Sequence, residues 1–456
     1  MKIVQSKGEM MLRRDFLKYT SAVAAMALIP VESMAAEYTG PLWIFVQAIG
    51  GWDPTSFCDP KGYLSSELDE NDRVTNSAMN KSYAKTEIVA NAKGVKYAPL
   101  SGSDGIDNYE FSEFFENNAD DLLVINGIDT QTNGHDSGRR YMMSGRLSEG
   151  YPALSALIAG INMPASPLAF VTAGGYDETD GVVAGTRLGN LNAINELAFV
   201  NSEGTANNDR YVPYSEGDTI TYKHPSVLER IKKARNERTK RLISKQKLAS
   251  VEALAKQYNL AHTGSNELVK LVEFLPDDLD THTYRRNNVF GQGRFAMAGY
   301  KAGLTSSVNI QTGGFDTHSN NDNGQRDSLA KLLKGVELLQ EEAVAQGIAD
   351  RVIFVIGSEF GRTPGYNDGD GKDHWSVSSM MFMGAGIRGG RVIGSTTSRH
   401  SAEKVNVSTL AKDNSGIKIT YAHVNKALRK LAGIENDELI TQYYPLTSVE
   451  ELDLFS

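Results

Sequence analysis

Acidic residues and histidines recur in five short motifs of this sequence. Each lies directly after an apolar run or inside a glycine-rich loop, where a side chain can approach a ligand closely. Carboxylates and imidazoles are ligands of zinc and other divalent metals, and arginine pairs with phosphate and sulfate oxygens. The motifs are Gly50-Gly51-Trp52-Asp53, His135-Asp136-Ser137-Gly138-Arg139, Gly313-Gly314-Phe315-Asp316-Thr317-His318, Ser358-Glu359-Phe360-Gly361-Arg362 and Gly371-Lys372-Asp373-His374-Trp375.

Two of the motifs combine residue types that indicate a metal or anion site most specifically. Asp316 and His318, two residues apart after an apolar run, suit a divalent metal. Glu359 leaves a strongly apolar run, where it could be a metal ligand or a base, and Arg362 could hold an anion. A structural reading is also open for this motif, as a Glu359–Arg362 ion pair.

The other three motifs have both a functional and a structural reading. Asp53 could contact a ligand or cap a following helix, and His374 could be a ligand or a histidine of a surface loop. In the remaining motif, Asp136 or Ser137 is expected to cap a helix over 137–144. The start of that helix would attract an anion through its free N–H groups and dipole.

The elements that must position these motifs alternate between strands and helices. The alternation predicts an α/β fold, with a doubly wound and mostly parallel sheet whose ligand site forms at the carboxyl ends of the strands. Buried parallel strands are expected at 42–48, 122–125, 168–172, 306–310, 352–356 and 379–383. Helices are expected at 109–117, 137–144, 153–159, 290–302 and 326–346.

Two stretches interrupt this alternation within a single expected domain, 37–456. Residues 60–108 are polar and predict an excursion over the active face, and residues of about 200–285 predict a helical insertion. The insertion contains a charged helix, roughly 225–258. Its lysines and arginines alternate with glutamates and an apolar stripe, which favours a solvated surface helix over a nucleic-acid-binding face.

The N-terminus resembles an export signal. Arg13-Arg14-Asp15-Phe16-Leu17-Lys18 follows the twin-arginine pattern, and a short apolar run, 19–30, precedes small residues at Ala35 and Ala36. We therefore expect a signal peptide over 1–36, the twin-arginine translocase as a partner during export, and a periplasmic or secreted protein. A generic secretory signal is the alternative. The run is too short for a stable membrane span, although an uncleaved signal would leave an anchor.

Composition argues against two further kinds of protein, one that binds nucleic acid and one that is stabilised by internal disulfides. The 456-residue chain has a formal net charge of −9 and no basic patch with interleaved aromatic residues, so we expect no nucleic-acid partner. The single cysteine, Cys58, excludes an internal disulfide. Cys58 is interpreted as a small buried residue rather than a nucleophile, because no basic residue stands beside it.

The motifs together resemble family 1501 of the domains of unknown function, within the alkaline-phosphatase and sulfatase superfamily. The resemblance implies a metal centre at the strand ends and the hydrolysis or transfer of phosphate or sulfate esters. It places Asp53 as a metal carboxylate of the first strand, and Asp316, His318 and His374 at one metal position. Glu359 stands where the superfamily usually has an Asp-His pair, so one imidazole is missing from a two-zinc centre.

The same resemblance places His135 at the position of the nucleophile, at the expected spacing from Arg139 and Gly145. Histidine there could attack phosphorus, ligate metal or mark the loss of a seryl intermediate.

The expected function is an exported hydrolase of phosphate or sulfate esters that uses metal-activated water. The ion would be zinc, manganese or calcium, and Arg139 or Arg362 would neutralise a small anionic or glycan substrate. The alternative is a non-catalytic exported protein of the same fold that binds a metal, a glycan or a protein partner. The expected metal ligands are Asp53, Asp316, His318, Glu359 and His374.

Overall fold

The computed structural model of the chain describes residues 38–64, 79–188 and 287–456, together with short pieces between 230 and 276. The predicted signal peptide and nearly all of the predicted helical insertion lie outside the described residues. No helix in the described ranges has both the length and the apolar content that crossing a bilayer requires.

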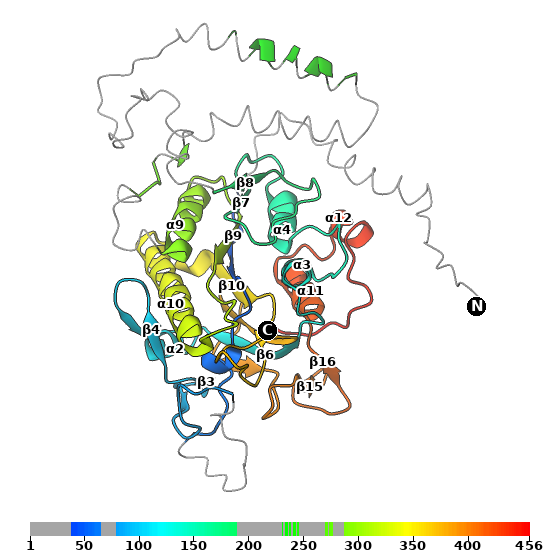
Figure 1. Cartoon of the computed structure of the whole chain (residues 1–456). Coiled ribbons are helices and arrows are strands. Elements are labelled where there is room, and N and C mark those ends of the chain that lie inside the picture. Colours follow the sequence, from blue (N-terminus) through cyan, green and yellow to red (C-terminus); the bar gives the residue numbers. More distant parts are fainter. Residues whose placement is uncertain are drawn as a thin grey trace, which may run out of the picture.

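An eight-stranded sheet forms the centre of the protein (Figure 1). Its strands are β1 (Leu42–Ala48), β6 (Leu123–Asp129), β7 (Phe170–Thr172), β8 (Gly185–Arg187), β9 (Ser307–Thr312), β10 (Val352–Ser358), β13 (Val377–Gly384) and β14 (Arg391–Ile393). They are arranged in the order β14-β6-β13-β10-β1-β9-β7-β8. All neighbouring pairs are parallel except those of β13 with β10 and with β6, so the predicted mostly parallel sheet is confirmed.

The predicted parallel orientation of strand 379–383 is wrong. This segment belongs to β13, which is antiparallel to both of its neighbours. Two parallel neighbours that follow each other in the chain need a crossover connection, usually a helix, which returns the chain to the end of the sheet where the first strand began. The described connection from β10 to β13 contains only the short strands β11 (Gly361–Arg362) and β12 (His374–Trp375) and no helix, so the chain turns back directly.

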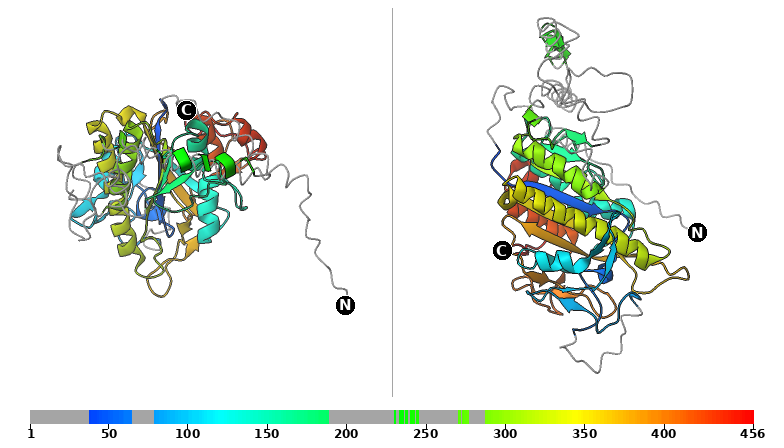
Figure 2. Two further views of the ribbon diagram at one scale, coloured as in Figure 1. Left: turned by 90° about the horizontal axis from the view of Figure 1, so that it is seen from above. Right: turned by 90° about the vertical axis from the view of Figure 1, so that its left-hand side faces the viewer.

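Two hydrophobic cores lie on opposite faces of the sheet, because side chains alternate along each strand. In β1, Ile44 and Val46 join one core while Trp43 and Phe45 join the other, so the strand is buried on both faces. The helices α2 (Phe111–Asn117), α9 (Asn288–Lys301) and α10 (Asn321–Ala345) cover the first face. The second is covered by α3 (His135–Ser144), α4 (Leu154–Asn162) and α11 (Tyr421–Leu431) (Figures 1 and 2).

Helix boundaries differ from expectation where capping decides them. Helix α3 begins at His135, with Gly134 as its N-cap, and not at the predicted cap Asp136 or Ser137. The Ser137 hydroxyl instead contacts the hydroxyl of Thr132, 2.6 Å away. His135 is therefore in the first turn of the helix. Helix α10 begins five residues before the predicted start at 326, and α11 and α12 (Glu438–Gln442) were not predicted.

The described part of the polar excursion packs against α10. It contains four short strands in two antiparallel pairs, and the backbone N–H of Ser103 donates to Asp327 of α10 at 2.9 Å. These strands are β2 (Val89–Ala90), β3 (Lys96–Tyr97), β4 (Ser101–Ser103) and β5 (Asn108–Glu110). A further pair, β15 (Lys404–Val405) and β16 (Ile417–Lys418), and the 3-10 turns η2 (Pro54–Ser56) and η4 (Ala349–Arg351) complete the described elements.

Candidate metal centre

The three central parallel strands end level with one another. Ala48, the last residue of β1, pairs with Thr312 of β9 on one side and with Ser358 of β10 on the other. The motifs that follow these strands consequently meet at one edge of the sheet, as parallel strands require.

Two glycines permit the close approach of these segments. Gly50 has a φ of +122°, and a Cβ there would lie 2.3 Å from the backbone nitrogen of Asp316. Gly138 allows α3 to pack on the end of β10, because a Cβ there would lie 2.8 Å from the carbonyl oxygen of Glu359. The first turn of α3, with His135, is thereby brought over the strand ends.

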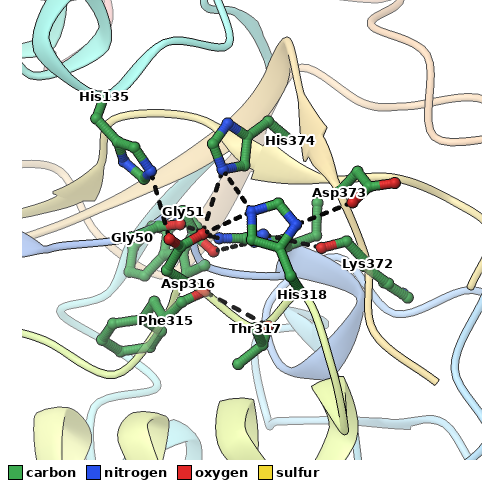
Figure 3. A network of polar contacts seen from close by, with 12 residues as sticks. Gly50, Gly51, His135, Phe315, Asp316, Thr317, His318, Lys372, Asp373 and His374 are labelled. Atoms are coloured by element: carbon green, nitrogen blue, oxygen red, sulfur yellow. Dashed lines mark hydrogen bonds and ion pairs between the residues drawn. The ribbon is translucent and has the colours of Figure 1, made fainter. Parts of the chain in front are cut away.

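Three imidazoles converge on the Asp316 carboxylate (Figure 3). The Nε2 atoms of His318 and His374 lie 3.1 and 3.2 Å from Asp316 Oδ1, and 3.1 Å from each other. His135 Nε2 lies 3.5 Å from Asp316 Oδ2. Ligand atoms of His135, Asp316 and His374 all lie within 4.8 Å of one another.

The opposite nitrogen of each ring is held by an acceptor. His135 Nδ1 contacts Glu359 Oε1 at 2.9 Å, His318 Nδ1 contacts Asp373 Oδ1 at 2.9 Å, and His374 Nδ1 contacts the carbonyl of Asn133 at 2.7 Å. Carboxylates and carbonyls only accept, so Nδ1 carries the hydrogen on every ring. A neutral ring in this tautomer presents a lone pair at Nε2.

This arrangement fits a divalent metal ion. Lone pairs of imidazoles that face a carboxylate and each other repel unless a proton or a metal cation lies between them. Metal-bound histidines typically donate their second nitrogen to a carboxylate or carbonyl, as all three rings do here. Ligand atoms at zinc-like bond lengths of about 2.0–2.1 Å are separated by about 3.3 Å in a tetrahedron. The contacts of the three rings with Asp316, and of His318 with His374, range from 3.1 to 3.5 Å. The described residues whose ligand atoms all lie within 4.8 Å of one another are His135, Asp316 and His374, without His318.

Asp316 is ionised and reachable from solvent. Partial burial would raise its pKa, but the hydrogen bond and the charge of the Arg362 guanidinium lower it to about 2. Its side chain is 48% exposed. A negative ligand is therefore available at neutral pH, at a surface that a solute can approach.

Glu359 holds an imidazole instead of joining the ligand atoms. Its side chain is buried, and Oε1 accepts hydrogen bonds from Gly50 N at 2.9 Å and from His135. Its other oxygen, Oε2, is buried and has no hydrogen-bond partner among the described residues. We expected a metal ligand here. Glu359 directly follows β10, and this position places its carboxylate against Nδ1 of His135, where it orients the ring.

Arg139 lies beside this cluster, four residues after His135 and therefore on the same face of α3. Its Nε is 3.5 Å from Glu359 Oε1, and its side chain is 29% exposed. The predicted association of Arg139 with the site is thus compatible with its position in the fold.

Two predicted site residues, Asp53 and Arg362, are completely buried and make their contacts inside the protein. The Asp53 carboxylate is buried and pairs with Lys372 Nζ at 2.6 Å, so it does not join the ligand atoms. Arg362 is completely buried, and its guanidinium donates to the carbonyls of Gly50, Gly51 and Lys372 and to Asp316. It stabilises the strand-end loops and has no exposed surface with which to contact a substrate.

The sequence matches the family model described as "Protein of unknown function (DUF1501)" over residues 42–415. The chain belongs to this family. A search of curated proteins found no relative of this DUF1501 chain.

Solved structures similar to the DUF1501 chain include sulfatases and a phosphatase. The PsFucS1 sulfatase from Pseudoalteromonas sp. is 9% identical, with a TM-score of 0.34 and coverage of 98% of this chain and 77% of that one. The TAB5 alkaline phosphatase mutant with Mg bound in its M3 site is 9% identical, with a TM-score of 0.32 and coverage of 86% and 98%. At such identities and scores, these matches do not bear on activity.

Three contacts of this DUF1501 site were not predicted. Asp373 and the Asn133 carbonyl each hold a histidine, and Lys372 neutralises Asp53. Lys372 and Asp373 stand directly before His374 in the sequence, so their proximity was visible but their roles were not. Cys58 is buried as predicted, and burial raises the pKa of its thiol well above the usual range.

Proposed function

We propose that this protein is a metal-dependent hydrolase of phosphate or sulfate esters. The observation that carries the proposal is the convergence of three Nε2 atoms on the Asp316 carboxylate, with all three Nδ1 atoms held from behind. Metal-ligating histidines almost always donate their second ring nitrogen to a carboxylate, a carbonyl or water, and all three rings have such an acceptor here.

The proposed ligands are Asp316 and the Nε2 atoms of His135 and His374, with His318, whose Nε2 contacts Asp316 and His374, as the fourth. Three imidazoles and one carboxylate favour zinc or manganese over calcium, which prefers six to eight oxygen ligands. A metal in such a site polarises an ester oxygen and lowers the pKa of bound water toward neutrality. In this proposal His135 is a ligand and not the nucleophile considered from its sequence position.

Anion recognition is assigned to α3. The Arg139 guanidinium can pair with two oxygens of a phosphate or sulfate group. The helix begins at His135, so the N–H groups of its first turn and the positive end of its dipole also favour an anion near the metal. Both features lie on the element that carries one of the ligands.

The exposure of the site favours esters on large molecules. The side chains of Asp316 and His318 are 48% and 49% exposed, so the reacting group would be held at the surface and not enclosed. An ester group on a glycan chain could reach such a site. The twin-arginine motif supports action in the periplasm or outside the cell, after export in the folded state.

The test is metal analysis of protein purified from its native compartment, combined with hydrolysis of 4-nitrophenyl phosphate and sulfate. We expect near-stoichiometric metal and hydrolysis of at least one ester, both lost in Asp316→Ala/His318→Ala. His423→Gln, outside the cluster, is the control and should retain both. Protein that contains no metal and takes up none would overturn the proposal. Bound metal without hydrolysis of either ester would instead favour the binding role.

A further inference from the structure

The edge of the sheet that holds the histidine cluster also contains a fully buried cationic side chain, that of Lys372. Lys372 and Asp53 are both completely inaccessible, and Lys372 Nζ is 2.6 Å from Asp53 Oδ2. A buried ion pair requires further hydrogen bonds to offset the loss of hydration. The surroundings of both groups therefore decide how this pair is stabilised.

The ammonium group is surrounded by oxygen atoms. Besides Asp53, Lys372 Nζ contacts Thr55 Oγ1 at 3.4 Å and the carbonyl of Met79. The ring of Tyr366 lies 5.0 Å from Nζ, within the range of a cation–π contact. Three oxygens match the three N–H donors of an ammonium group, so its hydrogen-bonding capacity is filled.

The Asp53 carboxylate is equally occupied. Oδ1 accepts from the backbone N–H of Thr55 at 3.0 Å and from its hydroxyl at 2.7 Å, and Oδ2 accepts from Asn321 at 3.2 Å as well as from Lys372. Burial would raise the pKa of Asp53, but Lys372 and Thr55 hold it below its usual value. Asp53 is therefore ionised and fully hydrogen-bonded.

The ammonium group cannot easily leave this position. The backbone N–H of Lys372 donates to the carbonyl of Thr317 at 3.0 Å, and its own carbonyl accepts from Arg362 at 2.8 Å. The residue is fixed on both sides of its Cα. A metal ion beside Asp53 would have to displace a tethered cation that already has all its partners.

We propose that Lys372 supplies, as a built-in ammonium ion, the positive charge that a second metal would supply beside Asp53, so that each chain holds one metal ion. This inference rests on the proposed metal centre at Asp316. It differs from the superfamily resemblance, in which Asp53 is a metal ligand. The oxygen cradle is a cation site, but the chain itself provides the cation.

The first experiment counts metal ions per chain, by elemental analysis of the wild type and of Asp53→Asn/Lys372→Met. The double variant replaces both charges with neutral groups of similar size, which buried pairs often tolerate. We expect one ion per chain in both proteins. Two ions in the wild type, with one lost in the double variant, would overturn the inference. Loss of metal in Asp316→Ala/His318→Ala tests the proposed function separately.

The second experiment removes only the ammonium group. Lys372→Ala leaves the oxygens of Asp53, Thr55 and Met79 around a space that a hard cation such as Mg²⁺ can fill. We expect Mg²⁺ to raise the unfolding temperature of Lys372→Ala by about 3 °C or more, as ligand binding to the folded state does. When the Asp316 centre is already loaded with metal, neither the wild type nor Asp53→Asn/Lys372→Ala should respond.

The outcomes of this experiment are distinct. A Lys372→Ala protein that folds only with Mg²⁺ supports the inference, since the ion then replaces the missing charge. An unfolding temperature that Mg²⁺ leaves unchanged would contradict it, because the cradle would then not be a cation site. If Lys372→Ala does not fold under any condition, the metal count in the wild type and in Asp53→Asn/Lys372→Met decides.

Discussion

The two charged groups at the carboxyl edge of the sheet differ in how their charges are balanced. The Asp53–Lys372 pair is wholly buried, and both partners come from the chain. The histidine cluster around Asp316 is partly exposed. The Asp316 carboxylate pairs with the buried Arg362 at 2.6 Å, and its other contacts are the Nε2 atoms of three histidines. The Asp53–Lys372 pair is thus a closed site, in which the chain supplies both charges. The histidine cluster around Asp316 is an open site, which fits an ion from solution.

Burial explains why the two sites are built differently. A buried carboxylate without a positive partner strongly destabilises the folded protein. A lysine of the same chain provides that partner, so no ion has to be bound. Asp316 is 48% exposed and pairs with Arg362, so its charge is stabilised before any ligand binds. Chemistry on a substrate also requires access, which only the open cluster offers.

The strongest disruption of the open site is His374→Ala. This ring contacts both Asp316 and His318, so its replacement removes one proposed ligand together with its contacts to two others. We expect the metal content to fall from about one per chain to near zero. Ester hydrolysis should fall on the order of 1,000-fold, because a bound metal contributes several kcal/mol.

The same measurements on His423→Gln provide the control. His423 caps α11 and contacts Glu450, away from the cluster. Its replacement should leave metal content and hydrolysis unchanged. Equal losses in both variants would mean that His374→Ala acts through general instability and not through the metal.

The closed site is disrupted most by Lys372→Met alone. This change leaves Asp53 buried without its cation, and breaking a buried pair in this way costs about 3–5 kcal/mol. The free energy of unfolding, measured with urea, should decrease by that amount. Asp53→Asn/Lys372→Met should recover most of it, because neither charge remains. A double variant that is less stable than the single one would contradict this account of the pair.

The sequence supported prediction of the fold more readily than of the ligand set. Apolar runs such as 352–356 identified the strands, because strands buried on both faces read as continuous hydrophobic segments. The antiparallel course of β13 was missed because its run of apolar residues contains no information about direction. The start of α3 at His135 was missed because Gly134 caps the helix without a side chain.

At the site, sequence identified the motifs but not the partner of each side chain. Asp53 and Glu359 both follow a buried strand, and both were expected to bind metal. Their roles depend on which group of a distant segment reaches them, Lys372 in one case and His135 in the other. Such pairings arise from loop packing between residues more than 200 positions apart, which no local pattern encodes.

A smaller effect is expected from Glu359→Gln, which keeps the side-chain shape and an acceptor for His135 but removes the charge. The bond from His135 Nδ1 to Glu359 is buried on the glutamate side and 2.9 Å long. Changes to groups that hold metal-bound histidines typically weaken metal binding 10–100-fold. We expect a loss in this range for zinc, measured by competition with a chelator. An unchanged affinity would contradict the expectation that the charge of Glu359 strengthens metal binding through His135.

The smallest effect is expected from Asp373→Asn, the matched change on the exposed side of the cluster. Asp373 holds His318 Nδ1 over the same 2.9 Å, but its side chain is 61% exposed. The hydrogen bond to His318 lowers the pKa of Asp373, yet solvent and salt screen an exposed pair to less than about 1 kcal/mol. Zinc affinity should therefore decrease by less than about fivefold, and the difference should shrink in high salt. Equal losses in Asp373→Asn and Glu359→Gln would mean that burial does not set the strength of these two contacts. That result would contradict the role of burial in distinguishing the charged groups at this edge of the sheet.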